Sequence, residues 1–397
     1  MRPLTDDVVD NIADAMAKRL SDVETAVLRM IGRRVRLIGE LMPSDATKLA
    51  RMRELGADIA QITQMLAKAT ELNTAELETI YAAAATTNQL FAARFYAARN
   101  LPMLAYTQNA TLQNIVKAQA RITAGSFANI SQTTVMAGGG LDRDETFVPI
   151  SQAYRRIVDT CITTVQSGLG DYNSAVRDSL ALMARGGIRT VEYASGHKRR
   201  LDSAVRMNII DGVRAVNQAV AEQMGKEYGA DGVELSAHMT CAPDHLPMQG
   251  RQFSTAEFDN LQNERSSRSV DGRQYLPIKR RIGTWNCRHF AYPIIIGVST
   301  PTHSDEQLDK LIRDNETAIE IAGKQYTPYE ASQLMRQLET QIRKAKNEAV
   351  VFGASGDATA ANAARNRVSS LTLTYKAVAE AANMRMKYTR LRTPGYR

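Results

Sequence analysis

Apolar residues recur at three- and four-residue spacing along much of the chain, which predicts helices that each turn one face to a core. One stripe extends over 12–41 and includes Val27 and Leu37, and a second extends over 49–66. A Pro-Ser-Asp turn separates the two stripes, and its serine, Ser44, is expected to cap the second helix. The pattern therefore predicts a helical first third of the chain.

The middle of the chain mixes helical spacing with strict alternation. Helical stripes recur over 151–166, 172–185 and 202–228, whereas 188–193 and 232–238 read as short strands. An apolar triplet at 294–296 adds a buried strand, and Ser254 with Glu257 has the spacing of a capping box at the start of a short helix. This part is expected to be a mixed α/β domain.

Helical spacing returns in the last part of the chain. Thr327, Pro328 and Glu330 combine a helix cap, a proline at the first helical position and the capping-box glutamate. The turn Gly353–Asp357 separates this helix from a final one, so the two are expected to pair as an antiparallel hairpin.

The sequence thus predicts a mainly α protein with a small α+β core. Long N-terminal helices, a central mixed α/β domain and a C-terminal helical hairpin are its expected parts. A run of three glycines is the clearest linker candidate, since glycine loses much conformational entropy when it is ordered. The predicted ranges are a helical region at 1–137, a Gly-rich linker at 138–148, a central domain with a Cys/His loop at 149–325, the hairpin at 326–384 and a basic tail at 385–397.

The composition is that of an ordinary globular protein with a basic balance. The 397 residues carry a net charge of +8, which favours a polyanionic neighbour without setting a fold. Aromatic residues make up only 6%, which argues against a base-stacking, single-strand binder. Three cysteines are too few for a disulfide scaffold, and neither a signal peptide nor a membrane span is visible. The expectation is synthesis in a cytosol, with no membrane in assembly.

Most of the Cys and His residues gather in two short segments, HMTCAPDHLPMQGRQF and WNCRHF. Cys241, His245, Cys287 and His289 have spacing that a zinc ion could use, because thiolate and imidazole ligands suit zinc. The alternative is that both cysteines are small buried hydrophobes and that the histidines satisfy local hydrogen bonds. No cofactor is required by the sequence, and zinc stays an open candidate.

The same segments also allow an enzymatic interpretation. Asp244 and His245, followed by Asn286 and His289, resemble the HNH endonuclease pattern, in which a histidine activates water and a metal holds phosphate. The short spacing between Asn286 and His289 and the lack of a clear helix after His289 weigh against it. Phosphate-binding loops and nucleophile elbows are absent from the sequence.

Two basic segments are candidates for contact with DNA or another anion. One precedes the second Cys/His segment, and the other is the C-terminal tail, which contains no acidic residue. Clustered cations attract phosphates in a salt-dependent way, although such runs are also common on solvated surfaces. The candidate contacts are Arg280, Arg281, Arg385, Lys387, Arg390 and Arg392.

Three stretches of the chain resemble a known family. They are SAHMTCAPDHLPMQGRQFS, WNCRHFAYPIIIGVSTP and YTPYEASQLMRQLETQIRKAK, in which Tyr326, Tyr329, Glu330 and Gln333 stand at the start of a helix. The chain is similar here to the phage minor capsid protein 2 family, which is distantly similar to the head-morphogenesis proteins typified by phage Mu protein F. The resemblance extends from about Tyr154 to the C-terminus and does not cover the first helices.

The resemblance implies a low-copy structural protein of a tailed-phage head, made in the bacterial host cytoplasm and located in the virion. Its expected partners are the portal protein, other capsid proteins and packaged double-stranded DNA, with an oligomer around the portal and ejection with the genome as further expectations. It implies no catalytic residue. The Cys/His segments would then fix a loop of the α+β core, through His238, Cys241, Asp244, His245, Gln249, Gly250, Asn286, Cys287 and His289.

Overall fold

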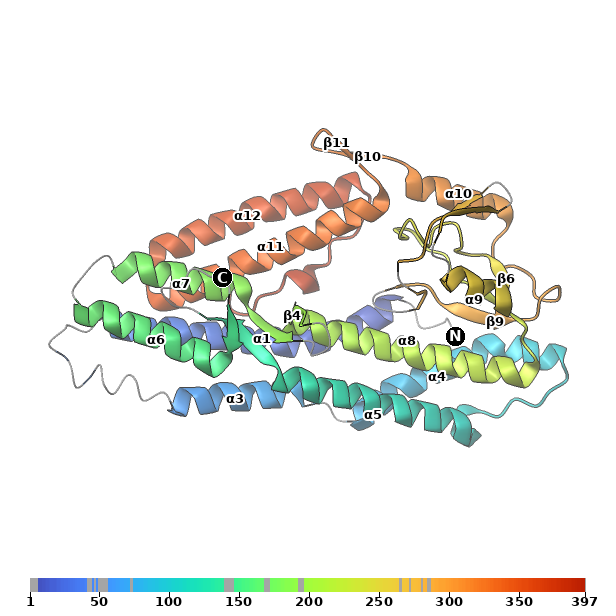
Figure 1. Ribbon diagram of the computed structural model, residues 1–397, viewed down its shortest axis with the longest axis horizontal. Coiled ribbons are helices and arrows are strands. Elements are labelled where there is room, and N and C mark those ends of the chain that lie inside the picture. The colour runs from blue at the N-terminus through green and yellow to red at the C-terminus, as the bar shows by residue number, and fades with distance from the viewer. Residues whose placement is uncertain are drawn as a thin grey trace. The chain divides into compact units, whose positions relative to one another are not determined.

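The computed structural model confirms the predicted fold class, because the protein is mainly helical with a few small antiparallel sheets (Figure 1). The chain divides into two compact units. Unit 1 comprises residues 1–13, 72–125 and 207–334, and unit 2 comprises 14–71, 126–206 and 335–397. The residues that the structure describes are 6–40, 45, 48, 56–71, 74–138, 146–167, 172–191, 196–263, 266–270, 273–279, 281–283 and 287–396.

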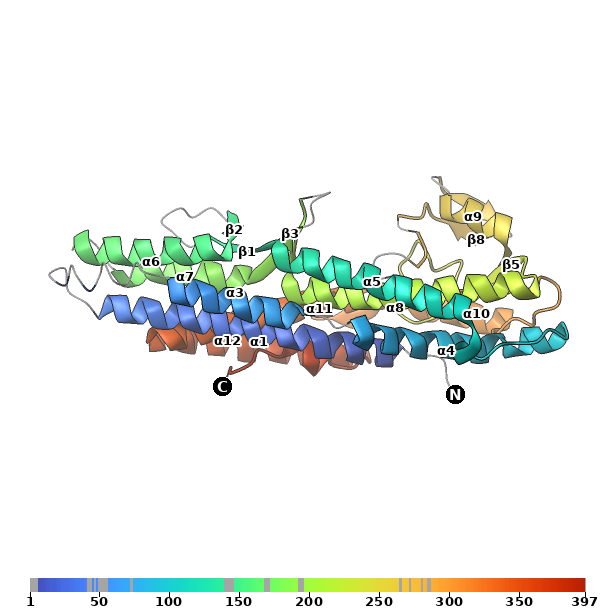
Figure 2. The same ribbon diagram turned by 90° about the horizontal axis from the view of Figure 1, so that it is seen from below.

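The helices of unit 2 pack around one long helix. This helix, α1 (Asp6–Gly39), lies between α3 (Gly56–Thr70) and the hairpin of α11 (Pro328–Ser355) and α12 (Ala358–Ala381), as Figure 1 and Figure 2 both show. Gly32 permits the close approach, since a Cβ there would lie 2.7 Å from a backbone oxygen of α11. The predicted C-terminal hairpin is therefore confirmed, and its partner within unit 2 is the N-terminal helix.

The buried face of α1 differs from the predicted stripe near its C-terminal end. Leu37 is 47% exposed, whereas Leu28, Ile31, Val35 and Ile38 are buried. A helix turns by about 100° per residue, so Leu37 points roughly 80° away from the direction of Val27, while Ile38 returns to within about 20° of it. The prediction for Leu37 was wrong because three- and four-residue steps accumulate this drift.

Unit 2 also contains a four-stranded antiparallel sheet and two further helices. Its strand order is β2 (Phe147–Pro149), β1 (Thr134–Ala137), β3 (Ile188–Val191) and β4 (Lys198–Arg200). The helices α6 (Ile150–Ser167) and α7 (Tyr172–Gly186) follow the predicted ranges.

The Gly-rich segment at 138–148 joins β1 to β2, which pair with each other, and Gly138 donates its N–H to the Thr146 carbonyl at 2.8 Å. Residues 139–145 of that segment lie outside the described part. The two compact units are each built from segments that are separated in the sequence. This division does not test the five predicted sequence ranges, which stay a prediction.

Three long helices lie wholly or mostly in unit 1. They are α4 (Thr74–Ala98), α5 (Ala110–Gln132) and α8 (Leu201–Tyr228), with a short 3-10 turn at Tyr106–Gln108. Tyr81 of α4 is fully buried, and its hydroxyl lies 2.8 Å from that of Thr123 on α5. Gly212 of α8 faces this pair, so the three helices meet at one tightly packed point.

The rest of unit 1 is a small α+β part built on a three-stranded sheet. Strand β5 (Gly232–Leu235) lies between β6 (Gln252–Ser254) and β9 (Ala291–Ile294), and all pairings are antiparallel. The predicted strand ending at His238 stops earlier, at Leu235, where the chain turns into the Cys/His loop. The predicted strand at 294–296 also ends early, since Ile296 is 41% exposed and follows the last paired residue.

Smaller elements complete this part of unit 1. The short helix α9 begins as predicted, because Ser254 and Glu257 exchange capping-box hydrogen bonds of 2.8 and 3.3 Å. Thr327 and Glu330 do the same at the start of α11, at 2.8 and 3.2 Å. The remaining elements are α9 (Thr255–Asn263), β7 (Arg268–Val270), β8 (Arg273–Tyr275), α10 (Asp305–Glu316), β10 (Ile319–Ile321) and β11 (Lys324–Tyr326).

Replacing Asp357 with alanine is expected to lower the free energy of unfolding by about 1 kcal/mol, the usual cost of losing a helix N-cap. The Asp357 carboxylate accepts the Ala360 N–H at 2.9 Å and pairs with Arg177 at 2.7 Å. Burial alone would raise the pKa of this carboxyl, but these partners outweigh it and hold the pKa below its usual 3.8. Its contribution is therefore present above pH 3.8 and is lost as the pH falls through the lower folded-state pKa. Urea unfolding of the unmodified protein and the variant, each at neutral and at acidic pH, measures the stability lost. A loss of the same size at the two pH values would contradict the prediction.

Candidate functional site

Both Cys/His segments adjoin the central strand of the small sheet in unit 1. In the pairing of β5 with β9, Leu235 stands opposite Ala291. Residues that follow β5 therefore lie beside residues that precede β9. Ser236 donates its backbone N–H to the Phe290 carbonyl, and its hydroxyl accepts the Phe290 N–H, each at 2.9 Å. Strand register thus brings the loop 238–251 against the second segment.

The loop is closed by its own side chains and turns. Gln249 is buried, and its side-chain oxygen accepts the His238 N–H at 3.1 Å, which ties the two ends of the loop together. Gly250 has a φ of 72°, and a Cβ there would lie 2.3 Å from Leu308. Glycine is required at that position because a side chain would meet both backbone strain and a steric clash. Gln249 and Gly250 therefore shape the loop.

The four predicted zinc ligands come together, but not around one point. The Cys287 sulfur lies 3.7 Å from His245 Nδ1 and 3.5 Å from His289 Nδ1, and these three donor atoms lie within 4.8 Å of one another. The Cys241 sulfur lies 3.5 Å from His289 Nε2, on the other side of that ring. The ring of His238 stands 4.3 Å from that of His289. The chemistry of the site is thus centred on His245, Cys287 and His289, which are all buried.

The two cysteines of this site have opposite electrostatic surroundings. Burial raises the pKa of the Cys241 thiol, and the nearby charges of Cys287 and Asp244 raise it further. Burial would also raise the pKa of Cys287, but hydrogen bonds to His245 and to the backbone of Gly283 and His289 outweigh it, so that pKa lies below its usual value. Cys287 is therefore the thiol whose anionic form this environment favours.

His289 is held in its neutral form. Burial is the main cause, and the charges of His238, His245 and Arg214 add to it, so the pKa of His289 falls to about 2. A neutral imidazole has a lone pair that can accept a hydrogen bond or bind a metal ion. The same surroundings disfavour any step in which this imidazole takes up a proton.

The predicted HNH arrangement finds no support in this geometry. The Asp244 carboxylate accepts the Lys279 N–H at 3.0 Å and lies 3.8 Å from His245 Nε2, so it has structural partners. His289 is followed by strand β9 and not by the helix that such a site needs. Asn286 lies outside the described residues. The Cys/His cluster therefore resembles a buried structural feature more than a hydrolytic centre.

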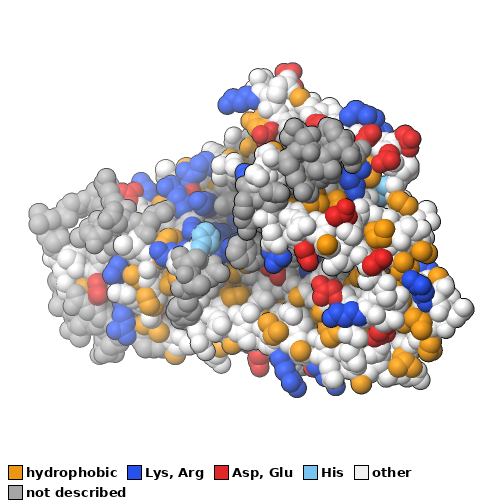
Figure 3. All heavy atoms as spheres, turned by 45° about the vertical axis from the view of Figure 1, so that its right-hand side comes forward, with side chains coloured by type: hydrophobic (Ala, Val, Ile, Leu, Met, Phe, Trp, Pro, Cys, Tyr) orange, Lys and Arg blue, Asp and Glu red, His pale blue; other side chains and the backbone are white. Residues whose placement is uncertain are grey.

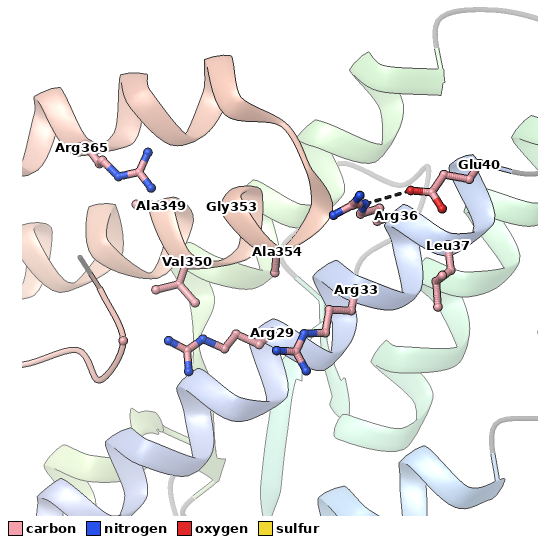
Figure 4. Close-up of a pocket in the computed structure, with 11 residues that line it drawn as sticks. Arg29, Arg33, Arg36, Leu37, Glu40, Ala349, Val350, Gly353, Ala354 and Arg365 are labelled. Atoms are coloured by element: carbon pink, nitrogen blue, oxygen red, sulfur yellow. Dashed lines mark hydrogen bonds and ion pairs between the residues drawn. The ribbon is translucent and has the colours of Figure 1, made fainter.

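A second site, in unit 2, was not predicted from the sequence. Four arginines border a hollow of about 670 Å³ between α1 and the α11–α12 hairpin (Figure 4). Its floor is formed by small residues of α11, among them Ala349 and Gly353. Glu40, paired with one of the arginines at 2.9 Å, is the acidic residue that borders it. The arginines are Arg29, Arg33, Arg36 and Arg365.

The sequence did contain a signal for this hollow. The stretch RMIGRRVR begins at Arg29, and Arg29, Arg33 and Arg36 follow one another at four- and three-residue spacing. Such spacing places the three side chains along one side of a helix. The contribution of α12 could not be foreseen, because Arg365 is more than 300 residues away in the sequence.

The predicted DNA contacts differ in exposure and lie in both units. Arg281, Arg385 and Arg392 are exposed, whereas Arg390 lies 3.8 Å from Glu339 and is mostly buried. The tail that carries four of them packs within unit 2 through Leu391, which is buried. Arg280 lies outside the described residues, and Lys387 is half-buried. The face shown in Figure 3 carries Lys and Arg side chains interspersed with Asp and Glu. These residues stay candidates for anion contact.

The structure thus shows a mostly helical scaffold that holds a buried, hydrogen-bonded Cys/His cluster. The model of the family described as phage minor capsid protein 2 matches residues 4–377, which is most of the chain. The protein belongs to this family and is a structural protein of a bacteriophage capsid. The match includes the N-terminal helices, which the resemblance seen in the sequence did not cover. Neither a curated protein nor a solved structure gives a match. Among the described helices, none is long and apolar enough to cross a membrane.

Proposed function

We propose that the protein is a low-copy head protein that assembles at the portal vertex, in contact with packaged double-stranded DNA. Membership of the minor capsid family supports a place in the virion, and the basic charge of the chain suits a neighbour of DNA. Synthesis in the bacterial cytoplasm, assembly as an oligomer around the portal and departure with the genome belong to the same proposal. Retention of this protein on a column of immobilised portal protein at moderate salt would support the proposed portal contact, and its passage through the column would contradict it.

The arginine-lined hollow of unit 2 is the main observation that supports contact with DNA. Four guanidinium groups against one carboxylate give the hollow a net positive charge. Arginine forms paired hydrogen bonds to phosphate oxygens, and the small residues of the floor leave space for a phosphate chain. Three of the arginines come from α1 and Arg365 comes from α12, so the hollow presents cations from two helices. Such a surface suits the DNA backbone and carries no sequence preference.

The double variant Arg33→Gln/Arg36→Gln is expected to weaken DNA binding. Both side chains are exposed, so the substitutions remove charge without disturbing a core. A plot of the logarithm of the binding constant against the logarithm of salt concentration should become shallower by about 2, because each lost phosphate contact reduces the slope by about 1. Fluorescence anisotropy with a random-sequence duplex at several salt concentrations measures this slope.

A matched control exists on the same helix. Lys18 and Arg19 are exposed residues of α1 that do not border the hollow. The variant Lys18→Gln/Arg19→Gln removes the same charge, and it should keep the slope of the unmodified protein. An equal reduction of the salt slope in both variants would show that only net charge matters for DNA binding. An unchanged slope in both variants would show that the hollow does not contact DNA.

A further inference from the structure

Two sulfur–nitrogen distances in the Cys/His cluster match those of a tetrahedral zinc site. Zinc binds thiolate at about 2.3 Å and imidazole at about 2.0–2.1 Å, which places sulfur and nitrogen ligands about 3.6 Å apart in a tetrahedron. The Cys287 sulfur lies 3.7 Å from His245 Nδ1 and 3.5 Å from His289 Nδ1. One sulfur thus stands at the ligand distance from two nitrogens.

Each of these imidazoles has a second partner on its other nitrogen. His245 Nε2 lies 3.8 Å from the Asp244 carboxylate, and His289 Nε2 lies 3.5 Å from the Cys241 sulfur. Histidines that bind metals usually present the second nitrogen to a carboxylate or another acceptor, which fixes the ring and its tautomer. Asp244 and Cys241 thus stand next to the nitrogens where such outer partners are found, although the Asp244 carboxylate lies beyond hydrogen-bond distance.

We propose that His245 Nδ1, Cys287 Sγ and His289 Nδ1 bind a zinc ion, and that Asp244 and Cys241 hold the two imidazoles in place. This assignment differs from the four-ligand set expected from the sequence, because Cys241 faces the wrong nitrogen of His289 to share the ion. In the described part of the chain three donors form this group, so the fourth position is left to a further ligand.

The position of the site implies a structural role for the ion. His245 belongs to the loop after β5, and Cys287 and His289 belong to the segment before β9, so the ion would join the two segments. Cys287 is also part of the apolar core of this region, with Leu235 and Met248. Metal binding that joins separated segments stabilises the folded state, since the unfolded chain has no preformed site.

The full-length protein, loaded with zinc or with cobalt as a spectroscopic probe, tests the assignment. We expect one ion per chain and a thiolate-to-cobalt charge-transfer absorption that arises from a single sulfur. Cys287→Ser should abolish this absorption and weaken zinc binding by more than about 100-fold, because it removes a ligand. Asp244→Asn should weaken zinc binding by about 10–100-fold, the usual effect of an outer contact.

The variants Cys241→Ser and Cys161→Ser test whether Cys287 is the one cysteine that binds the ion. Cys241→Ser should keep the full charge-transfer absorption, and Cys161→Ser, a buried cysteine of unit 2, should bind zinc as the unmodified protein does. Circular dichroism shows that each variant is folded. Loss of the absorption in the Cys241 variant would overturn the three-ligand assignment, and failure of the unmodified protein to retain zinc after dialysis would overturn the site itself.

Discussion

Replacing Glu24 with alanine should lower the free energy of unfolding by about 3–5 kcal/mol, because it removes the nearest carboxylate partner of the buried cation Arg200. Glu24 lies on α1, is 5% exposed, and accepts two hydrogen bonds of 2.8 Å from Arg200 through its two oxygens. Asn347 of α11 donates a third at 2.8 Å. The carboxylate thus joins three separate segments of unit 2, and urea unfolding measures its contribution.

The surroundings of Glu24 explain why the loss should be large. Arg343 is buried nearby and pairs with Asp202, which in turn lies 3.5 Å from Arg200. Burial and the charge of Arg200 lower the pKa of Arg343 to about 9, while the charge of Glu24 acts in the opposite direction. Removing Glu24 therefore leaves two neighbouring guanidinium groups with less compensation in a low-dielectric interior.

The matched control is Glu40→Ala, at the turn that directly follows the same helix. Glu40 pairs with Arg36, but both side chains are more than half exposed. Exposed ion pairs contribute less than about 1 kcal/mol, so this variant should be nearly as stable as the unmodified protein. If Glu24→Ala lost no more stability than Glu40→Ala, the buried ion pairs around Glu24 would not contribute to the stability of the fold.

Replacing Gly212 with alanine should destabilise unit 1, because the added methyl group has no space in the packed helices. A Cβ at this position of α8 would lie 1.9 Å from the Tyr81 hydroxyl oxygen and 2.8 Å from that of Thr123. Tyr81 is fully buried and cannot swing away into solvent. Overpacking of this kind costs about 1–3 kcal/mol, and loss of the Tyr81–Thr123 hydrogen bond costs about 1–3 kcal/mol more. Thermal and urea unfolding report the change.

Gly125→Ala is the control for this prediction. Gly125 lies within α5, and a Cβ there would meet nothing within 4 Å. Alanine in an uncrowded helix position stabilises by about 0.5–1 kcal/mol relative to glycine, so this variant should unfold at a slightly higher urea concentration. A loss of stability in the Gly125 variant equal to that in the Gly212 variant would attribute the effect to glycine replacement in general.

Local features of this chain were predictable because they depend on nearby residues. The capping boxes at Ser254 and Thr327 follow from short sequence patterns and are observed. The turn predicted at Gly353–Asp357 is shorter in the structure, because α11 continues to Ser355. The helical stripes were also recognised, and the error at Leu37 arose from the drift of helical spacing over ten residues. Strand ends were predicted less well, as Ile296 shows, because a strand ends where its pairing partner ends.

The candidate sites depend on pairs that are distant in the sequence. The cluster could be guessed because Cys241 and His245 share a motif, yet its geometry could not, since the orientation of the His289 ring decides which sulfur meets which nitrogen. The arginine hollow needs α12 beside α1. Likewise, the pair of Glu24 and Arg200 joins residues separated by 176 positions, which no local pattern reports.

Quantitative mass spectrometry of purified phage particles tests the central claim most directly. The account predicts that a few copies of this protein are present in each filled particle, far fewer than the major capsid protein. A lower copy number after the genome has been released would support ejection with the DNA. Absence of the protein from filled particles would contradict its place as a minor structural component of the head.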